Sequence, residues 1–447
     1  MEESSQSIWT TARNLFLPSY LPTFLHGICM SILIPVLPLM FRSLGATDTH
    51  TGVALALIGL GTVLADVPAG GVILRYGKLF TMKIAIGFCV FVSIAVFLLP
   101  TVPVLMMACF LWGFASGFYS VARTSHMKET VREKNQVGRM NSFLGGAQRM
   151  ANTLGPLVGG TIAQHISFRW AILAQAPFFV LAVLSLHTSP PEREENKGPS
   201  VRELPSETEG KDDEMGEEEM QELDVADSVT AETVVVASSS GPPSGSEVYK
   251  PTYASTFQQN KHCFATVGVF CFLLCCIRAS RKMILPLAGA NIKMGAQEVG
   301  IVNSVSFCID AAFFWLSGVL MDKIGRKAGA APACLIMGAG MVLLGFCPNR
   351  ECLYVSGILT GFGNSLSSGV VLVLGMDNAP LLHPSIFLGM HIALADLGSV
   401  MGPLLLGICL TEGSFQLAAY FIGFIASLAL LWLFFVRTKE SIDLTTT

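Results

Sequence analysis

The chain has 447 residues, of which 52% are hydrophobic and only 13% are charged, and its mean hydropathy is +0.58. Soluble domains average about 25% charged residues, so the composition excludes a water-soluble globular protein and predicts a protein of the lipid bilayer. The net charge is −4, but residues 189–262 hold 17 acidic and 6 basic residues, which leaves the rest of the chain mildly basic. No basic stripe with interleaved aromatic residues predicts binding to nucleic acid.

The apolar runs along the chain are long enough to cross a bilayer as helices, which takes roughly 20 residues each. Residues 1–19 are polar, and we expect no cleavable signal peptide there because no basic region precedes a short apolar core. The predicted fold is an all-α membrane protein with two six-helix bundles, in residues 20–188 and 263–436, and a tail at 437–447. The twelve predicted spans are 20–41, 52–73, 81–100, 103–122, 141–163, 170–187, 263–289, 297–321, 328–347, 352–375, 386–410 and 415–436.

Residues 189–262 separate the two bundles and contain the stretches KDDEMGEEEMQELD and ASSSGPPSGSE. Their charge and their Ser, Gly and Pro content predict a disordered acidic linker, which either tethers the bundles or binds a cytoplasmic partner. Basic residues gather in the loops after the second, fourth and eighth spans, and the positive-inside rule therefore places both termini and the linker in the cytoplasm. These residues are Arg75, Lys78, Lys83, Arg123, Lys128, Arg132, Lys134, Arg139, Lys323, Arg326 and Lys327.

The twelve cysteines lie mostly inside apolar runs, where cysteine behaves as a small hydrophobic residue. We therefore expect neither a disulfide framework nor a zinc site, although Cys347 and Cys352 flank a short turn and could pair. No phosphate-binding loop, HExxH or GxSxG pattern occurs. The sequence thus predicts a protein that is not an enzyme and that holds no metal or cofactor.

The two halves of the chain are related by an internal repeat. An offset of 248 residues superposes Gly52 on Gly300, and an offset of 247 superposes Pro156 on Pro403. The glycines at 70, 77 and 113 likewise match those at 318, 325 and 361. Two six-span halves in parallel repeat are the layout of major facilitator transporters, which bind substrate between the halves near the membrane midplane.

A charged turn follows the eighth predicted span in the stretch GVLMDKIGRK at 318–327. Gly318 predicts a close helix–helix approach, Gly325 permits a tight turn, and Asp322 can accept hydrogen bonds from a helix N-terminus or pair with a base. The stretch resembles the cytoplasmic signature G-x-x-x-D-R/K-x-G-R-K of the major facilitator superfamily. The resemblance implies a cytoplasmic gate, in which the acid helps to hold the outward-facing state; the alternative is a turn that merely anchors the topology.

The equivalent turn of the first half, GGVILRYGK, keeps Gly70, Arg75 and Gly77 but has Leu74 in place of the acid. The latch of the first half is therefore in doubt, unless Asp66, two turns earlier, replaces it.

The fifth predicted span carries GPLVGG, and the eleventh carries the related GPLLLG at 402–407. Proline interrupts the helical hydrogen bonds and glycines thin the helix, which predicts kinked helices that pack closely. The first motif resembles the G-P-x-x-G-G signature of drug:proton antiporters and implies export, with ordinary helix packing as the alternative. Its residues are Gly155, Pro156, Gly159 and Gly160, matched by Gly402 and Pro403.

The tenth and eleventh spans, LSSGVVLVLGMDNAP and FLGMHIALADLGSVMGPLLLG, also resemble those of bacterial multidrug and tetracycline exporters. The chain departs from that branch in the fourth span, where CFLWGFASG lacks the arginine of the R-x-x-x-G motif. The base that relays protons in that branch is therefore missing or has moved.

Ionisable residues inside membrane spans are costly, and each is a candidate functional residue. Arg149 and Asp396 each lie six residues before a Gly-Pro pair, so the repeat makes them equivalent. Asp310 lies in the middle of the eighth span and could pair with Arg278 or Arg281 of the seventh, which share one helical face with Lys282. The predicted lining of the central cavity is Arg149, Arg278, Arg281, Asp310 and Asp396.

Asp310 and Asp396 are candidates to load and release a proton, because a low dielectric favours the neutral acid. His26 could titrate near neutral pH, although an interior hydrogen-bonded histidine would have the same sequence context. Static ion pairs that hold helices together would also account for the buried charges. Arg281 and Lys282 could instead lie near the membrane edge and extend their charged groups into water.

Together these features predict a secondary active transporter of a small organic solute, with proton-coupled efflux by alternating access as the first choice. The alternatives are a proton-coupled symporter or vesicular carrier of an organic anion, and a membrane scaffold or receptor that no longer transports. The expected partners are the solute, protons and the bilayer. We expect a monomer in the plasma membrane, with an organellar membrane as the alternative.

Overall fold

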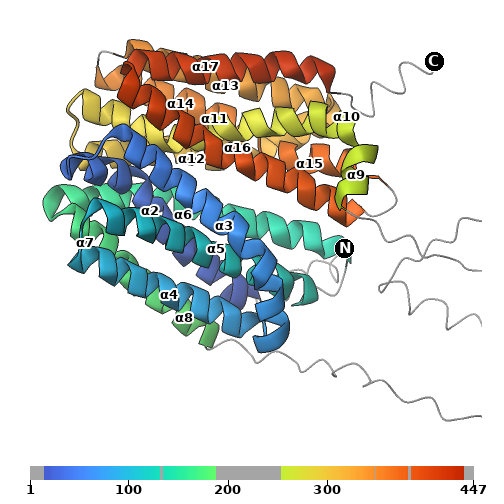
Figure 1. Cartoon of the computed structure of the whole chain (residues 1–447), viewed down its shortest axis with the longest axis horizontal. Helices are drawn as coiled ribbons and strands as arrows, with labels where there is room; N and C mark the ends of the chain where they lie inside the picture. Colours follow the sequence, from blue (N-terminus) through green and yellow to red (C-terminus); the bar gives the residue numbers. More distant parts are fainter. Residues whose placement is uncertain (1–14, 131–133, 188–252, 348, 381–383, 437–447) are drawn as a thin grey trace, which may run out of the picture. The chain divides into compact units, whose positions relative to one another are not determined.

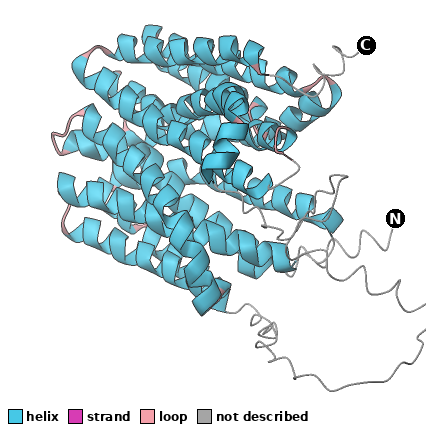
Figure 2. Cartoon of the chain, turned by 45° about the vertical axis from the view of Figure 1, so that its right-hand side comes forward, coloured by secondary structure: helices cyan, strands magenta, loops and turns pink. Residues whose placement is uncertain are grey.

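The computed structural model describes residues 15–130, 134–187, 253–347, 349–380 and 384–436, and all of the elements in these ranges are helices (Figures 1 and 2). In a bilayer no water satisfies the backbone, and a helix pairs its N–H and C=O groups internally. The first half comprises η1 (Phe16–Tyr20), α2 (Leu21–Ser43), α3 (Asp48–Tyr76), α4 (Lys78–Leu98), α5 (Val102–Thr130), α6 (Lys134–His165), α7 (Phe168–Leu173) and α8 (Gln175–His187).

The second half follows the same order of long helices. It comprises α9 (Tyr253–Gln259), α10 (Lys261–Cys263), η2 (Phe264–Gly268), α11 (Val269–Asn291), α12 (Ala296–Lys323), α13 (Arg326–Phe346), α14 (Arg350–Leu366), α15 (Val370–Asp377), α16 (Pro384–Glu412), α17 (Phe415–Trp432) and η3 (Leu433–Phe435). Residues 189–252, which make up most of the predicted linker and its proposed partner site, lie outside the described residues. Residues 1–14 and 437–447 also lie outside them. The last ten residues of that linker prediction, 253–262, form α9 and most of α10 instead of irregular chain.

Eleven helical segments among the described residues are long and apolar enough to cross a membrane. The predicted fifth span lies within α6, which is 32 residues long but too polar to belong to this set. Its polar residues face neighbouring helices, since Asn152 accepts a hydrogen bond from Ser31 and Arg149 pairs with Asp310. The number of twelve spans therefore stays a prediction.

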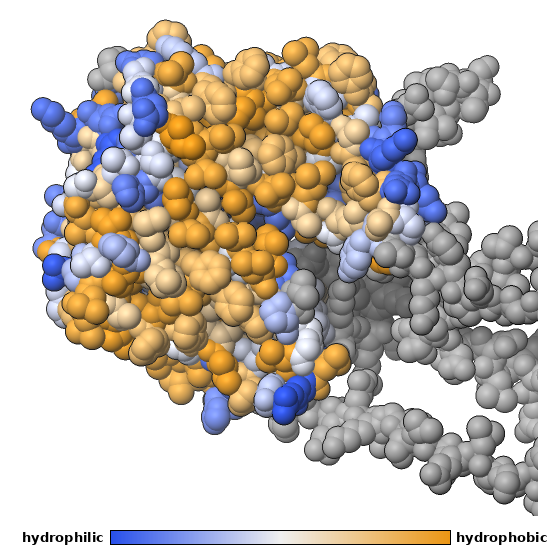
Figure 3. All heavy atoms as spheres, in the orientation of Figure 1, coloured by the Kyte–Doolittle hydropathy of each residue, from blue (hydrophilic) through white to orange (hydrophobic). Residues whose placement is uncertain are grey.

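Each half has its own hydrophobic core. Trp112 and Phe179 are fully buried in the first, and Phe270 and Met337 in the second. Large apolar side chains cover the outside, and Figure 3 shows them over the middle of the helices on one face, with hydrophilic residues at the two ends. This distribution is that of a multi-pass membrane protein, whose outer surface contacts lipid.

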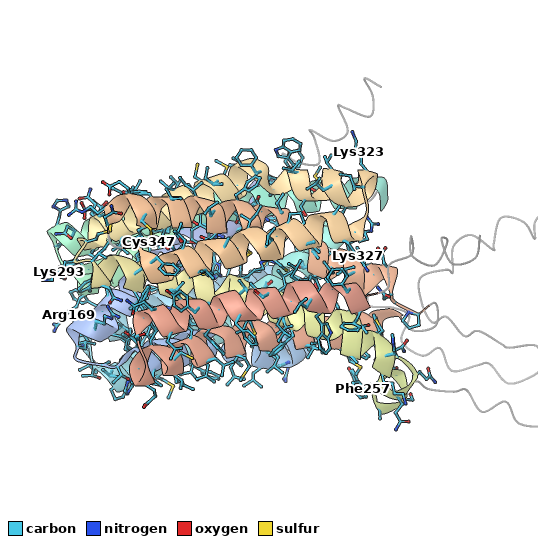
Figure 4. All side chains as sticks on the ribbon, turned by 90° about the horizontal axis from the view of Figure 1, so that it is seen from above. Arg169, Phe257, Lys293, Lys323, Lys327 and Cys347 are labelled. Carbon is cyan, nitrogen blue, oxygen red and sulfur yellow. A yellow bond between two sulfur atoms is a disulfide. The ribbon has the colours of Figure 1, made fainter. Side chains whose placement is uncertain are left out.

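Glycine turns connect equivalent helices at one end of each half. Gly77, between α3 and α4, has φ 85°, and Gly325, between α12 and α13, has φ 123°. Residues with a Cβ rarely adopt these angles, which explains the glycine at both places. Lys323 and Lys327 lie at this end, whereas Arg169, Lys293 and Cys347 lie at the opposite end (Figure 4). The positive-inside rule predicts that the lysine-bearing end faces the cytoplasm, and the two ends are named the cytoplasmic and the non-cytoplasmic end on that prediction.

Cys347, just after α13, and Cys352, in the first turn of α14, form a disulfide, which is the one pair that the sequence left open. The two cysteines stand on either side of a turn, and their Cα atoms are 5.3 Å apart, which is within the range that a disulfide can span. Disulfides persist in oxidising compartments. The bond therefore agrees with placing this end of the helices outside the cytoplasm.

Two equivalent glycine contacts join the halves. A Cβ on Gly52 of α3 would overlap the Pro403 carbonyl of α16 and lie 3.0 Å from Gly407 Cα. A Cβ on Gly300 of α12 would likewise overlap the Pro156 carbonyl of α6 and lie 3.1 Å from Gly160 Cα. Absence of a side chain lets these helices approach closely. The residues matched by the repeat thus form two equivalent close contacts between the halves at the non-cytoplasmic end.

Polar contacts reinforce this end. The hydroxyl of Thr49 donates a hydrogen bond to Thr411 Oγ1 at 2.8 Å, and the backbone N–H of Ala296 donates to Gln164 Oε1 at 2.7 Å. Gly70 and Gly318, toward the cytoplasmic end, have no atom within 4 Å of an added Cβ. The close helix approach expected at Gly318 is therefore absent, because the halves are held together at the other end.

Candidate functional site

An ion pair connects the two halves near the middle of the helices. Arg149 Nη1 of α6 donates to Asp310 Oδ1 of α12 at 2.7 Å, and both side chains are largely buried. Arg149 lies 16 residues before the end of α6, and Asp310 lies 14 residues after the start of α12. At 1.5 Å per residue, both are roughly 20–25 Å from the non-cytoplasmic end. The pair therefore lies deep in the interface, where the glycine contacts have brought α6 against α12.

The partner of Asp310 differs from the expectation. The sequence predicted that Asp310 pairs with Arg278 or Arg281 of its own half, but the ion pair is made by Arg149 of the other half. The second oxygen, Asp310 Oδ2, accepts a hydrogen bond from Asn364 Nδ2 at 2.9 Å. Arg278 reaches the same amide, since its Nε donates to Asn364 Oδ1 at 3.0 Å. Asn364 of α14 thus separates the two charges that were expected to meet.

Arg281 lies in the interior, not at the membrane edge, because it is only 3% exposed. Its Nη1 donates to Ser306 Oγ at 3.2 Å and to the Thr360 carbonyl at 3.4 Å. The guanidinium lies over the ring of Phe307, with Cζ 4.6 Å from the centroid. A cation over a ring face is attracted by the π system. Helices α12 and α14 therefore fix Arg281 beside the Arg149–Asp310 pair.

The tenth predicted span is broken close to this cluster. Helix α14 ends at Leu366 and α15 begins at Val370, with Gly369 between them at φ 77°. Ser317 Oγ donates to the carbonyls of Leu366 and Ser368, each at 2.7 Å, which satisfies two backbone groups at the break. Arg149 Nη2 donates to Ser368 Oγ at 2.6 Å. Helix breaks at mid-membrane depth are a feature of transporter binding sites.

Asp396 does not join the cluster. It lies on α16, which packs against α3 and α11, and its carboxylate is close enough to that of Asp66 for the two to repel. Asp66 thus has Asp396 of α16 as a charged neighbour, and its replacement of the acid missing at Leu74 stays a prediction. The repeat makes Asp396 equivalent to Arg149, and the two helices lie at different interfaces between the halves.

His26 lies inside the first bundle. Its Nε2 is hydrogen-bonded with Ser116 Oγ at 3.1 Å, and its ring lies 4.7 Å from that of Tyr119. The side chain is 7% exposed. These surroundings are those of a hydrogen-bonded interior histidine.

The charged turn of the second half contains a small ion-pair network. Arg326 donates to Asp322 at 3.0 Å and to Asp377, at the end of α15, at 2.8 Å. The turn is therefore fastened to the second segment of the broken span. In the first half Arg75 lies over the ring of Tyr76, and Leu74 is 91% exposed. The two turns share a glycine backbone conformation, but Leu74 cannot supply the carboxylate that Asp322 provides in the second turn.

Several residues of the cluster were not predicted: Ser306, Phe307, Phe314, Thr360, Asn364 and Ser368. A neutral amide or hydroxyl is common in membrane helices, so its type alone carries little information. Asn364 and Ser368 could have been found from the sequence, because Asn364 and the Ser-Ser-Gly stretch are polar residues inside an otherwise apolar span. No group of three metal-binding side chains occurs among the described residues.

The fold is shared with solved transporters. A structure of the nucleoside transporter NupG superposes with a TM-score of 0.67 at 14% identity, over 96% of this chain and all of that one. A POT family transporter in complex with a thioalcohol-conjugated peptide gives 0.69 at 13%, over 94% and 95%. A bacterial homologue of the human lysosomal transporter Spinster gives 0.69 at 10%, over 96% of both chains. At these identities the likeness concerns the fold.

Sequence comparison identifies the family. An uncharacterized MFS-type transporter of Mycobacterium tuberculosis, known from strains CDC 1551 / Oshkosh and H37Rv, is 28% identical over 162 residues. The match covers 36% of this chain and 23% of the length of those relatives. The model of the Major Facilitator Superfamily matches residues 20–242 and 270–446, which is most of the chain. The chain therefore belongs to the Major Facilitator Superfamily, a family of membrane transporters and not of enzymes.

Proposed function

We propose that this protein is a secondary active transporter that moves a small organic solute by alternating access between its two six-helix halves. The observation that carries the proposal is the Arg149–Asp310 ion pair, which joins the halves at mid-depth beside a broken helix. A pair placed across a moving interface can form in one state and separate in the other. The glycine contacts at Gly52 and Gly300 hold only the non-cytoplasmic end.

We further propose that Asp310 is the site of proton coupling. Its two oxygens are bonded to Arg149 and Asn364. A proton on Asp310 removes the negative charge that holds Arg149, so the α6–α12 interface loses its ion pair and the halves can rearrange. Asp396 remains a second candidate for the proton.

Efflux by proton antiport is the proposed direction, on the resemblance of GPLVGG to the antiporter signature. The second candidate is symport of an organic anion. It is favoured by the number of arginines around Asp310, since Arg149, Arg278 and Arg281 all lie close to this single acid. A monomer in the plasma membrane remains the proposed setting.

The test is flux driven by a pH gradient in proteoliposomes, against a panel of organic cations, anions and neutral drugs. We expect solute-dependent proton movement that Asp310→Asn abolishes. The matched control is Asp48→Asn, since Asp48 is also bonded to an arginine, Arg42 at 2.7 Å, but at the loop between α2 and α3.

Proton movement that is unchanged in Asp310→Asn would remove Asp310 from the coupling mechanism. Absence of flux for every panel member, from folded protein, would contradict transport and favour the scaffold alternative.

A further inference from the structure

The cluster around Asp310 has an excess of positive charge. Arg149 is paired with Asp310, and both oxygens of this acid are already bonded. Arg278, Arg281 and Lys282 lie within electrostatic range of one another and share one face of α11. In the described part of the chain, these three cations have no carboxylate within ion-pair distance. With Asp310 ionised, the cluster therefore carries three uncompensated positive charges.

Two of these cations also have donor groups without a hydrogen-bond partner among the described residues. Arg281 Nε is buried and bonds to no atom of the structure, while its Nη1 is held by Ser306 and Thr360. Lys282 is exposed, and none of the described residues bonds to its ammonium group. A buried donor without a partner is costly, and so is an uncompensated charge at mid-membrane depth. The sequence has both, which indicates that a group other than the described residues completes the site.

The acids elsewhere in the interface do not supply the missing charge. Asp396 lies near Cys275, one turn from Arg278 on α11, and has Asp66 as a charged neighbour, but it forms no ion pair with Arg278. Arg281 and Lys282 interact instead with Asp310 and with the remaining cations of the cluster. No acid of the described residues supplies the compensating negative charge, which points to a ligand as its source.

We propose that this cluster binds a small organic anion with two or more negative charges, carried by carboxylate or phosphate groups. Lys282 is the group that the anion reaches, because it is exposed while Arg281 is buried. Arg281 and Arg149 are held against Phe307 and Phe314, with Cζ to ring-centroid distances of 4.6 and 4.8 Å. These contacts fix the guanidinium groups in advance, so binding orders few additional side chains.

The anion site itself does not depend on the proposed transport function. Only the statement that this anion is the transported solute rests on it. The anion and Asp310 compete for Arg149. Entry of the anion therefore weakens the ion pair between α6 and α12, which links occupancy of the site to movement of the halves.

Binding is tested first, on the purified full chain in lipid nanodiscs, by the shift in thermal unfolding with ligand concentration. The probes are succinate with its uncharged isostere succinamide, glycerol 3-phosphate with glycerol, and the organic cation tetraphenylphosphonium. We expect succinate or glycerol 3-phosphate to stabilise the protein, and the uncharged partners to have no effect. The two anions distinguish a carboxylate site from a phosphate site. Failure of both anions to bind, or equal binding of succinamide, would overturn the proposal.

Variants then locate the site. Lys282→Gln should raise the Kd of the bound anion about ten-fold or more, since charged hydrogen bonds contribute at this level. Lys282→Arg should keep the Kd within a few-fold. The matched control is Lys261→Gln, an exposed lysine roughly 30 Å away along the same helical segment, which should leave the Kd unchanged. Equal affinity in Lys282→Gln and wild type would place the anion elsewhere and contradict the proposal.

Counterflow of the same anion in proteoliposomes separates the two hypotheses. Binding without flux would support the anion site and contradict transport. Flux of tetraphenylphosphonium without binding of either anion would support transport and overturn the anion site.

Discussion

Replacing Gly300 by alanine should disfavour the state in which the non-cytoplasmic end is closed. The added Cβ would overlap the Pro156 carbonyl and lie 3.1 Å from Gly160 Cα, both of which are backbone atoms of α6. Backbone cannot move aside as a flexible side chain can. Overpacking of this kind costs about 1–3 kcal/mol. If the opposite state lacks this contact, the ratio of closed to open molecules falls by about 5- to 150-fold.

The assay is disulfide cross-linking at the second interface between the halves. Thr49 and Thr411 are hydrogen-bonded across α3 and α16, so Thr49→Cys with Thr411→Cys should cross-link when this end is closed. A protease site inserted within 189–252 lets a gel separate the halves unless the cross-link holds them. We expect Gly300→Ala to slow cross-linking. The control is Gly87→Ala, which meets no atom within 4 Å and should change nothing. An unchanged rate in Gly300→Ala would refute the reasoning that the two interfaces close together.

Three further predictions follow from individual contacts. Asn364→Ala should lower the stability of the protein by about 1–3 kcal/mol, because it leaves Asp310 Oδ2 and Arg278 Nε without their shared partner. Thermal unfolding in nanodiscs measures this loss, and a loss below about 0.5 kcal/mol would contradict the prediction. Asp377→Asn should lower the stability of the protein by about 1 kcal/mol, and by more than Asp322→Asn does. The reason is that the Asp322 side chain is 76% exposed and that of Asp377 only 19%, and the reverse order of stabilities would argue against the ion-pair network of Arg326. Cys347 and Cys352 should react with an impermeant thiol reagent on intact cells only after an impermeant reductant; labelling without reductant would exclude the disulfide.

The sequence was sufficient for the fold because membrane helices follow from the length of apolar runs. The repeat went further, since the matched glycines at 52 and 300 and the matched prolines at 156 and 403 lie in two close contacts between the halves. The fifth predicted span is the one without support as a membrane span. It lies in α6, which is long enough to cross a membrane, but the polar residues at its interfaces lower its hydropathy. Residues 253–262 were assigned to the linker because their composition is polar, yet most of them are helical.

The candidate site was harder to predict because charge pairing depends on which helices meet. Arg149 and Asp310 were both singled out, but their sequence separation of 161 residues gave no reason to pair them. Arg278 and Arg281 were preferred as partners because they lie in the adjacent span. The structure shows that α12 packs against both α6 and α14, and the polar residues of α14 take the bonds expected from α11.

The repeat conserves the backbone of the two interfaces but not their charge, and this difference has a mechanical consequence. The offsets that match the glycines place Arg149 on Asp396, Phe314 on Asp66 and Asp310 on Thr62. Opposite charges attract across α6 and α12, whereas α3 and α16 bring two carboxylates, Asp66 and Asp396, into electrostatic range of each other. Both interfaces are close-packed at one end, yet among the described residues only α6 and α12 carry an ion pair at mid-depth. If the halves rock about these interfaces, a proton or an anion acts directly on the α6–α12 side, and the α3–α16 side follows because the same rigid bundles form both contacts.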